Sequence, residues 1–492
     1  MMRVSIILVL VIVLTLISLV ESDATDVTIQ AQNRLEYYLD READSLGARS
    51  DSLRNRLVVD LLYGNFYGGI WYEAFHPIEK DTSFQGITQR YFGWTDDNAE
   101  VRIGNYYASF NKGLILRSYE SEDVQIDRNI EGIWGSYRAE KYNFEALTGK
   151  IQLRDPLSQS PLVRVRRNDV VGFRGEITPI RQIRFGGAAL RYTENDPLFG
   201  TSHTNAQEVA FDFTHGAFDL YANYARQQGT TSFGLMRFDQ LDEGDGTYVT
   251  AAISTGLIGI AGEYKNYYNL GLDINAPPAA NHRNQSANAF TGANGANERG
   301  FQISTFLAPF ENWTFEASVA QSSERPDPET GHAAHYIYNN FYEARGYIDR
   351  HILILNYERT NMGVEGIEHL PYGEFTYYID NENTVTMTGQ VKKYEKVISG
   401  KPDYNETDFS IAFSHSYFIT LTLFGGFTSE EFSEHELGFP ERSGAISLNL
   451  RYGEHDLNIF YGDQRGGFVC TEGTCREVPP FRGLKTTLVS RF

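Results

Sequence analysis

The residues of this chain best suited to chemistry lie in polar segments between strongly patterned stretches. His332 and His335 stand three apart, a spacing at which two imidazoles could share a metal on one helical turn, but no third ligand accompanies them. A second group surrounds His435 and consists of Glu430, Glu431, Glu434 and Glu436. These glutamates could bind divalent cations, although a solvated acidic loop is the simpler interpretation. The sequence therefore predicts no metal site at either place.

Sequence motifs of catalysis are missing as well. The chain contains no Gly-rich phosphate loop, no His-Glu-x-x-His helix and no Gly-x-Ser-x-Gly turn. A hydrolase triad made of scattered Ser, His and Asp residues stays open, because triads are recognised by geometry and leave no fixed spacing. We expect no enzymatic activity and no cofactor.

Two cysteines, Cys470 and Cys475, lie five residues apart in one polar segment. In an exported protein this arrangement favours a small disulfide loop. A metal site is the weaker interpretation, because two thiolates without a nearby histidine form an incomplete ligand set.

The stretches between these polar segments show a two-residue repeat of apolar and polar side chains. Apolar and polar residues alternate from Trp313 to Val319, from Thr384 to Lys392 and from Ile446 to Tyr452. Helical spacing fits none of these runs, whereas a sheet with one apolar and one polar face fits all of them. The segment from Leu35 to Leu39 could be the first such strand.

The connections between these runs alternate between short and long. Towards the C-terminus, short turns such as 453–454 follow long segments such as 426–443, and longer segments are also expected at 194–205, 226–245 and 269–297. Outer-membrane barrels have short periplasmic turns and long outer loops. We predict an all-β fold: one transmembrane, antiparallel, up-and-down β-barrel of about 24 strands, within a range of 22–26.

Both ends of the chain favour export to a membrane. Residues 1–24 have the layout of a cleaved signal peptide, with Arg3 before an apolar run that is short for a full span. The barrel would then occupy 25–492 and end on an amphipathic strand whose last residue, Phe492, we expect to act as the C-terminal insertion signal. The mean hydropathy is −0.38, so a membrane-embedded chain must span as a barrel.

Composition agrees with this fold and excludes one class of partner. Aromatic residues make up 14% of the chain, which suits strands and the interfacial girdles of barrels. The formal net charge of −21 argues against nucleic acid, which requires a basic surface.

The polar faces of the strands would line the lumen of such a barrel. Their charged residues are Arg102, Glu145, Glu208, Asp212, Asp219, Glu316, Glu374, Arg451 and Asp456. Acidic residues outnumber basic ones, so a water-filled lumen would favour cations. The alternative is that these charges pair with one another and with inward-folded loops.

One segment, from Ser109 to Asn129, mixes charges of both signs with Leu114, Ile115 and Leu116. This composition suits a loop folded into the barrel, where opposed charges would form a constriction. An ordinary outer loop and a further pair of strands are the alternatives. The residues of the predicted constriction are Lys112, Arg117, Glu120, Glu122, Asp123, Asp127 and Arg128.

Four stretches of the chain resemble one known group of proteins. They are 61–75, 104–107, 113–127, and the end of the chain from Cys470 to Phe492. Together they are similar to a domain-of-unknown-function family of Gram-negative outer-membrane β-barrels. The family tends to have Phe-Gly-x-Gly-Leu where this chain has Phe110-Asn111-Lys112-Gly113-Leu114, and Asn also tolerates the left-handed backbone of such a turn. The resemblance implies the barrel and the outer membrane, but no established activity.

We therefore carry two hypotheses for function. The first is a porin-like barrel for passive passage of small polar or ionic solutes, and the second is a non-conducting binding or structural barrel that contacts a surface or secretion partner. An exported soluble β-protein is a third, remoter one. The expected partners are outer-membrane lipid and lipopolysaccharide, the barrel insertion machinery and small solutes. No plug domain stands out near the N-terminus, so passive passage is favoured over active uptake.

Overall fold

The structure is a computed structural model. It describes residues 27–40, 51–77, 83–121, 126–154, 164–196, 200–232, 241–272, 274–279, 297–324, 336–363, 366–396, 403–429, 442–464, 467–471, 474–478 and 481–492. The predicted signal peptide, Glu122, Asp123, both histidines of the 332–335 pair and the acidic cluster around His435 lie outside these ranges.

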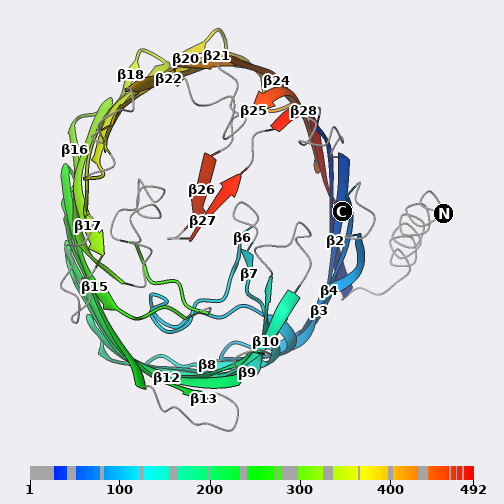
Figure 1. Ribbon diagram of the computed structural model, residues 1–492, viewed down its shortest axis with the longest axis vertical. Coiled ribbons are helices and arrows are strands. Elements are labelled where there is room, and N and C mark those ends of the chain that lie inside the picture. The colour runs from blue at the N-terminus through cyan, green and yellow to red at the C-terminus, as the bar shows by residue number, and fades with distance from the viewer. Residues whose placement is uncertain are drawn as a thin grey trace.

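The described strands form one closed antiparallel sheet of 24 strands, seen end-on as a ring in Figure 1. Closure depends on the pairing of β1 (Val27–Asp40) with β28 (Phe481–Arg491), which runs from Gln32 opposite Arg491 to Asp40 opposite Gly483. A closed sheet has no unpaired edge, which is the condition for spanning lipid with strands. The predicted all-β, up-and-down barrel of about 24 strands is confirmed.

Each remaining strand of the ring pairs with its neighbours in chain order. They are β2 (Asp51–Tyr63), β3 (Phe66–Pro77), β4 (Phe84–Thr95), β5 (Ala99–Tyr106), β8 (Ile130–Arg138), β9 (Tyr142–Arg154), β10 (Arg164–Ile180), β11 (Ile183–Asp196), β12 (Gly200–His215), β13 (Phe218–Ser232), β14 (Leu241–Ser254), β15 (Ile258–Tyr268), β16 (Glu298–Phe310), β17 (Trp313–Glu324), β18 (Tyr336–Ile348), β19 (His351–Asn361), β20 (Gly366–Tyr378), β21 (Asn383–Lys396), β22 (Tyr404–His415), β23 (Ile419–Thr428), β24 (Arg442–Tyr452) and β25 (His455–Gln464).

Two further short hairpins lie within the outline of the ring in Figure 1. One is β6 (Glu120–Ser121) with β7 (Ile126–Asp127), and the other is β26 (Gly467–Thr471) with β27 (Thr474–Val478). The backbone of Cys470 lies directly opposite that of Cys475 in the second hairpin. Their side chains are outside the described part of the structure, so the disulfide stays a prediction.

Connections alternate around the ring as the sequence indicated. At one end of the barrel, turns of two to four residues join the strands, and Gly64 supplies the left-handed backbone (φ +54°) of the first of them. Phe492 lies at this same end, where its N–H donates to the Ala31 carbonyl (2.8 Å) and its carbonyl accepts from the Ala31 N–H (3.1 Å). The final strand is therefore paired to its last residue.

Several strands are longer than their apolar pattern suggested. The segments 194–205 and 226–245 were expected to be long connections, but pairing continues to Asp196 opposite Gly200 and to Thr201 opposite Ser232. These extensions carry polar residues on both faces. The apolar–polar alternation that marks a strand in the sequence is lost there, while the backbone hydrogen bonds that define a strand do not depend on side-chain polarity.

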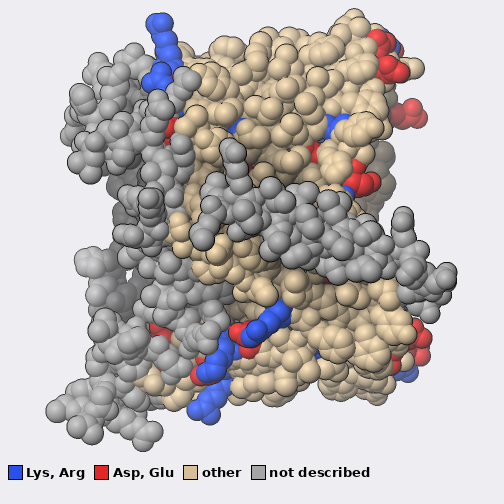
Figure 2. Space-filling model, turned by 90° about the vertical axis from the view of Figure 1, so that its right-hand side faces the viewer, with Lys and Arg blue, Asp and Glu red and all other residues tan. Residues whose placement is uncertain are grey.

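The outer face of the barrel is apolar. Phe173, Val209 and Leu423 are 62%, 61% and 51% exposed and project outward, while the residue next to each of them along the strand projects into the lumen. On the wall shown in Figure 2, charged side chains are sparse over the described surface. An apolar outer band is what a barrel in lipid requires. Among the described residues, no helix has the length and apolar character needed to cross a membrane.

Position on the wall should decide how the barrel tolerates a charge. Leu423 projects outward near the middle of β23 and Thr422 projects into the lumen. We expect Leu423→Arg to lower the free energy of unfolding in lipid vesicles by about 2–4 kcal/mol, the cost of an arginine facing the centre of a bilayer. The matched variant Thr422→Arg should change it by well under half that amount, and equal losses in the two variants would contradict the assignment of faces.

Candidate lumenal site

The segment after β5 forms a small hairpin, residues 108–118, which we call the inward hairpin. Its two arms are joined by backbone hydrogen bonds from Ser118 to Ala108 (2.8 Å) and from Phe110 to Leu116 (3.0 Å). The Ser118 hydroxyl also accepts from the N–H of Ala108 (2.9 Å). The hairpin is therefore a defined element in the described part of the segment 109–129.

The tip of the inward hairpin uses left-handed backbone at two positions. Asn111 has φ +44° and Gly113 has φ +81°. Asn111 stands where the family pattern has glycine, and its conformation confirms that asparagine keeps this turn. A β-carbon on Gly113 would lie 3.1 Å from the Ala276 carbonyl oxygen and 3.0 Å from the Arg117 side chain, so glycine is needed there for space as well as for backbone.

The inward hairpin lies inside the barrel against the inner face of β8–β15. Phe110, Leu114, Ile115 and Leu116 are fully buried, and they share one apolar cluster with Leu147, Val170 and Leu190 of the wall. Burial of each such side chain contributes about 1.5–3 kcal/mol before entropy costs. The hairpin is thus a fixed part of the barrel. The expectation of a polar inner face holds only in part over this sector, because the hairpin covers apolar residues of the wall there in place of water.

A second segment, residues 269–272 and 274–279, packs beside the inward hairpin, and we call it the inner loop. The Arg117 N–H donates to the Ile274 carbonyl (2.7 Å) and the Ala276 N–H donates to the Gly113 carbonyl (3.2 Å). The Asn275 side chain donates to the Leu114 carbonyl (2.8 Å). The sequence placed this segment in an outer loop. Its alternating Leu270, Leu272 and Ile274 were the signal that it is buried.

Glu120 of the constriction set is tied to the N-terminal strands of the barrel. Glu120 lies 2.6 Å from the Arg56 guanidinium of β2, and Arg56 also pairs with Glu73 of β3. Arg54 lies 3.5 Å from the same Glu73 carboxylate. These buried charges join the segment after the inward hairpin to the first three strands.

Asp127 is buried and satisfied by neighbours of its own segment. Its carboxylate accepts from the Tyr107 hydroxyl (3.0 Å) and from the Asn129 backbone (3.1 Å) and side chain (2.8 Å). Burial, reinforced by the charges of Asp127 and Glu120, raises the pKa of Tyr107 far above its usual range. The Tyr107 hydroxyl therefore stays protonated and continues to donate to Asp127.

The basic residues of the constriction set hold the segment in place. The Arg128 guanidinium donates to the Asn275 carbonyl (2.8 Å), and both Arg117 and Arg128 lie 5.7 Å from the centre of the Tyr119 ring. The Lys112 ammonium lies 5.4 Å from the ring of Tyr221. Among the described members of the set, we find anchoring contacts and no two opposed rows of charge.

Lumenal acids near the hairpin tip are paired. The Asn111 amide donates to Glu208 (2.6 Å), Arg184 lies 2.8 Å from Asp212, and Arg174 lies 3.6 Å from Glu145. A pocket of about 260 Å³ lies between the tip and this wall. At these three acids the structure favours charge pairing and hydrogen bonding over a free acidic surface. Sequence reasoning missed Arg174, which stands in no motif, and it considered Asn111 only for its backbone conformation and not for its bond to Glu208.

The inner face of β20–β25 differs from the wall under the hairpin. Hydroxyl and amide side chains project from it and bond across strands, from Thr376 to Thr386 (3.0 Å), from Thr388 to Ser410 (2.7 Å) and from Ser414 to Thr420 (3.0 Å). All six are partly exposed. The described inner surface thus includes an apolar sector under the inward hairpin and a hydroxyl-lined sector that meets solvent.

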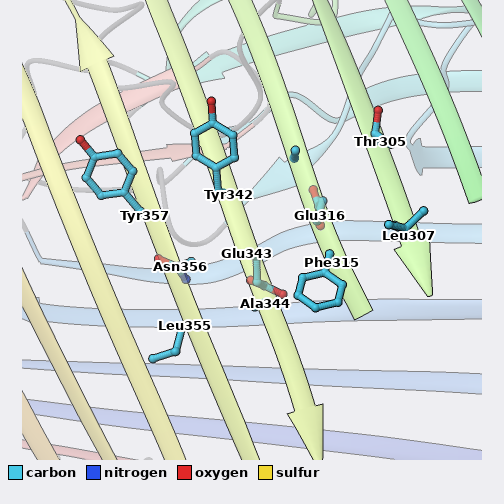
Figure 3. Close-up of a pocket in the computed structure, with 11 residues that line it drawn as sticks. Thr305, Leu307, Phe315, Glu316, Tyr342, Glu343, Ala344, Leu355, Asn356 and Tyr357 are labelled. Carbon is cyan, nitrogen blue, oxygen red and sulfur yellow. The ribbon is translucent and has the colours of Figure 1, made fainter. Parts of the chain in front are cut away.

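A groove of about 490 Å³ on the outer wall is no candidate for solute binding. Figure 3 shows Leu307, Phe315, Tyr342, Leu355 and Tyr357 on the outer side of β16–β19, where they line this groove. Such a shape suits the packing of lipid chains between large side chains. The described residues also contain no group of three or more His, Cys, Asp or Glu side chains arranged to hold a metal ion.

The fold is shared with large barrels of the outer-membrane type. The siderophore receptor PirA from Pseudomonas aeruginosa superposes with a TM-score of 0.50 at 10% identity, over 95% of this chain and 81% of that chain. OccK2 (OpdF) of the same organism gives 0.38 at 12% identity, over 68% and 92%. The P pilus usher PapC translocation pore gives 0.46 at 8% identity, over 95% and 99%. At 10% identity the likeness to PirA extends to the fold alone.

Sequence comparison identifies a family without a known activity. The model of a family of unknown function, DUF6029, matches residues 1–296 and 358–492. This confirms the resemblance drawn from the motifs around the inward hairpin and the C-terminus. No curated protein is significantly similar to the chain.

Removal of the Asn275 side chain should loosen the inward hairpin. We expect Asn275→Ala to speed hydrogen exchange at the amides of Arg117 and Ala276 by about tenfold, because the variant leaves the buried Leu114 carbonyl without its partner, a loss of roughly 1–3 kcal/mol. Exchange measured by mass spectrometry on the barrel in detergent tests this. Asn458→Ala on the hydroxyl-lined wall should leave both amides unchanged. Unaltered protection in Asn275→Ala would show that the inner loop does not hold the hairpin.

Proposed function

The chain belongs to the family of unknown function DUF6029, so its activity must be inferred from its lumen, and we propose that it conducts small polar or ionic solutes by passive passage. A barrel of this strand number encloses a lumen too wide for its own side chains to fill. The inward hairpin and the inner loop occupy one sector of it. The partly exposed hydroxyl-lined wall of β20–β25 is the observation that carries the proposal.

The proposal includes a place in the cell. The barrel would reside in the Gram-negative outer membrane after removal of residues 1–24, inserted by the barrel assembly machinery and surrounded by lipid and lipopolysaccharide. The apolar outer face and the aromatic pairs Trp313–Phe315 and Tyr336–Tyr338, near opposite ends of the wall, support it. The solute would pass without chemical conversion.

The lumen should prefer cations weakly. Most acids around the hairpin are paired, which reduces the field that the composition suggested. Glu374 faces the lumen from β20, and its described hydrogen bond comes from the neutral hydroxyl of Tyr372 (2.7 Å). An acid held by a neutral donor keeps its charge available to passing ions.

Conductance in a planar bilayer tests passage and its selectivity together. We expect the purified full-length barrel to give steady open-channel steps with a modest cation preference in asymmetric salt. Glu374→Gln should reduce the cation-to-anion permeability ratio by roughly a factor of two, the scale of one charge acting through water at short range. The matched variant Glu382→Gln, in a short turn outside the lumen, should leave the ratio unchanged.

An absence of channel steps in the bilayer would refute the proposal of passive passage. If the protein still migrates on a gel as a heat-modifiable barrel, the second hypothesis, a non-conducting barrel that contacts a partner, takes its place. The charge cluster of Arg56, Glu73 and Glu120, which ties the inward segment to the wall, is the feature that favours a filled lumen.

A further inference from the structure

Four aromatic side chains face the lumen in a row from β23 to β1, and the first two are separated by the intervening strand β24. They belong to Phe424 of β23, Phe460 of β25, Phe481 of β28 and Tyr38 of β1. Their ring centres are 6.4, 6.4 and 6.1 Å apart in that order. The inward direction follows from the strand period, because the adjacent residues Leu423 and Tyr461 project outward and are 51% and 44% exposed. We call this row the aromatic track.

The aromatic track is exposed although it faces the lumen. Phe424 is 43% exposed, and the other three rings are partly exposed. Lumenal apolar residues under the inward hairpin are, by contrast, buried by protein. Water contact with apolar rings is unfavourable by roughly 25 cal/mol for each Å². An exposed row of rings on an otherwise polar inner wall therefore marks a surface suited to a ligand.

Hydrogen-bonding groups lie directly beside these rings. In the register of the sheet, Ser410 is opposite Phe424, and Ser447 is opposite Phe460. The Ser447 hydroxyl accepts from the Asn458 amide (3.3 Å), and the Ser410 hydroxyl bonds that of Thr388 (2.7 Å). Hydroxyls and amides both donate and accept, so they can match a ligand that carries hydroxyl groups of its own.

One lumenal charge beside the aromatic track has a described partner. The Lys485 ammonium lies 5.1 Å from the centre of the Tyr38 ring, whereas the pair of Arg482 with Asp463 (3.0 Å) stands at outward-facing positions. A charged ligand would have to compete with the contact of Lys485. An uncharged ligand would not compete with it. A flat aromatic ligand would offer no hydrogen-bonding groups to the neighbouring hydroxyls.

We propose that the aromatic track binds neutral sugars, with pyranose rings lying on the phenyl faces and their hydroxyls bonded to the adjacent Ser, Thr and Asn side chains. A sugar ring presents an apolar face of C–H groups, and an aromatic face carries the negative potential that attracts them. Spacings near 6 Å let one oligosaccharide touch successive rings. This inference rests on the proposed function, because the sugar would reach the track through the lumen, and it names the class of solute.

Current blockade in a planar bilayer tests the sugar site. Maltohexaose added from the long-loop side should interrupt the ion current of the wild-type barrel in a concentration-dependent manner. Phe460→Ala should weaken blockade by about tenfold, equivalent to about 1.4 kcal/mol, while the open-channel ion current stays within about a factor of two, because the ring contributes no charge. A linear polyol of similar length, which lacks ring faces, should block poorly.

A matched variant on the same side of the barrel separates binding from general damage. Phe413→Ala removes a phenyl ring from β22 that projects outward and is 42% exposed, so its blockade should equal that of the wild type. Equal weakening in Phe413→Ala and Phe460→Ala overturns the sugar site. So does a full current without blockade by the sugar, or stronger blockade by an uncharged aromatic solute such as phenol.

Failure of the sugar site and failure of passage give different results. An open channel that ignores maltohexaose refutes the site and leaves the proposed function standing. If no channel opens, the proposed function fails, and calorimetric titration of the detergent-purified protein decides the site. Heat of maltohexaose binding that is lost in Phe460→Ala and kept in Phe413→Ala supports it, and absence of heat in the wild type refutes it.

Discussion

Closure of the backbone ladder is the constraint on which the rest of the structure depends. In lipid each strand must pair on both sides, and the contact of β1 with β28 removes the last open edge. A ring of 24 strands then encloses more space than its own side chains can fill. The inward hairpin and the inner loop fill part of this space and cover one sector of the wall. The other described sector keeps polar side chains that water can satisfy.

The two sectors have different roles in the lumen. Apolar side chains fix the inward hairpin to the inner face of β8–β15, and the buried pair Arg56–Glu120 ties the segment after it to β2. Across β20–β25 and towards β1, hydroxyls and the aromatic track remain accessible. A rigid covered sector and an accessible polar sector can coexist in one barrel, because successive side chains of each strand alternate between the two faces. A fixed hairpin also means that passage, where it occurs, follows the opposite wall.

The barrel itself was readable from sequence, because alternation and connection length both follow from one face in lipid and one in the lumen. Its strand ends were not, since the ladder at Thr201 and Ser232 continues through polar residues that carry no pattern. The mixed composition of 109–129 suited an inward segment with a charged constriction, with an outer loop or a further pair of strands as alternatives. The hydrogen bond from the Asn275 side chain to the Leu114 carbonyl could not be predicted, because it joins residues 161 positions apart in the sequence. The aromatic track was likewise hidden, since register alone brings its rings together.

Accessibility of the two sectors to a water-soluble reagent tests the account most directly. In a background of Cys470→Ser and Cys475→Ser, one would introduce Thr388→Cys on the hydroxyl-lined wall or Ala188→Cys under the inward hairpin, where Ala188 is 6% exposed. Both positions face the lumen, so lipid protects neither. The account predicts rapid modification by a charged thiol reagent at position 388 and strong protection at position 188. Equal modification at both positions, or protection at both, would contradict a lumen divided into a covered and an open sector.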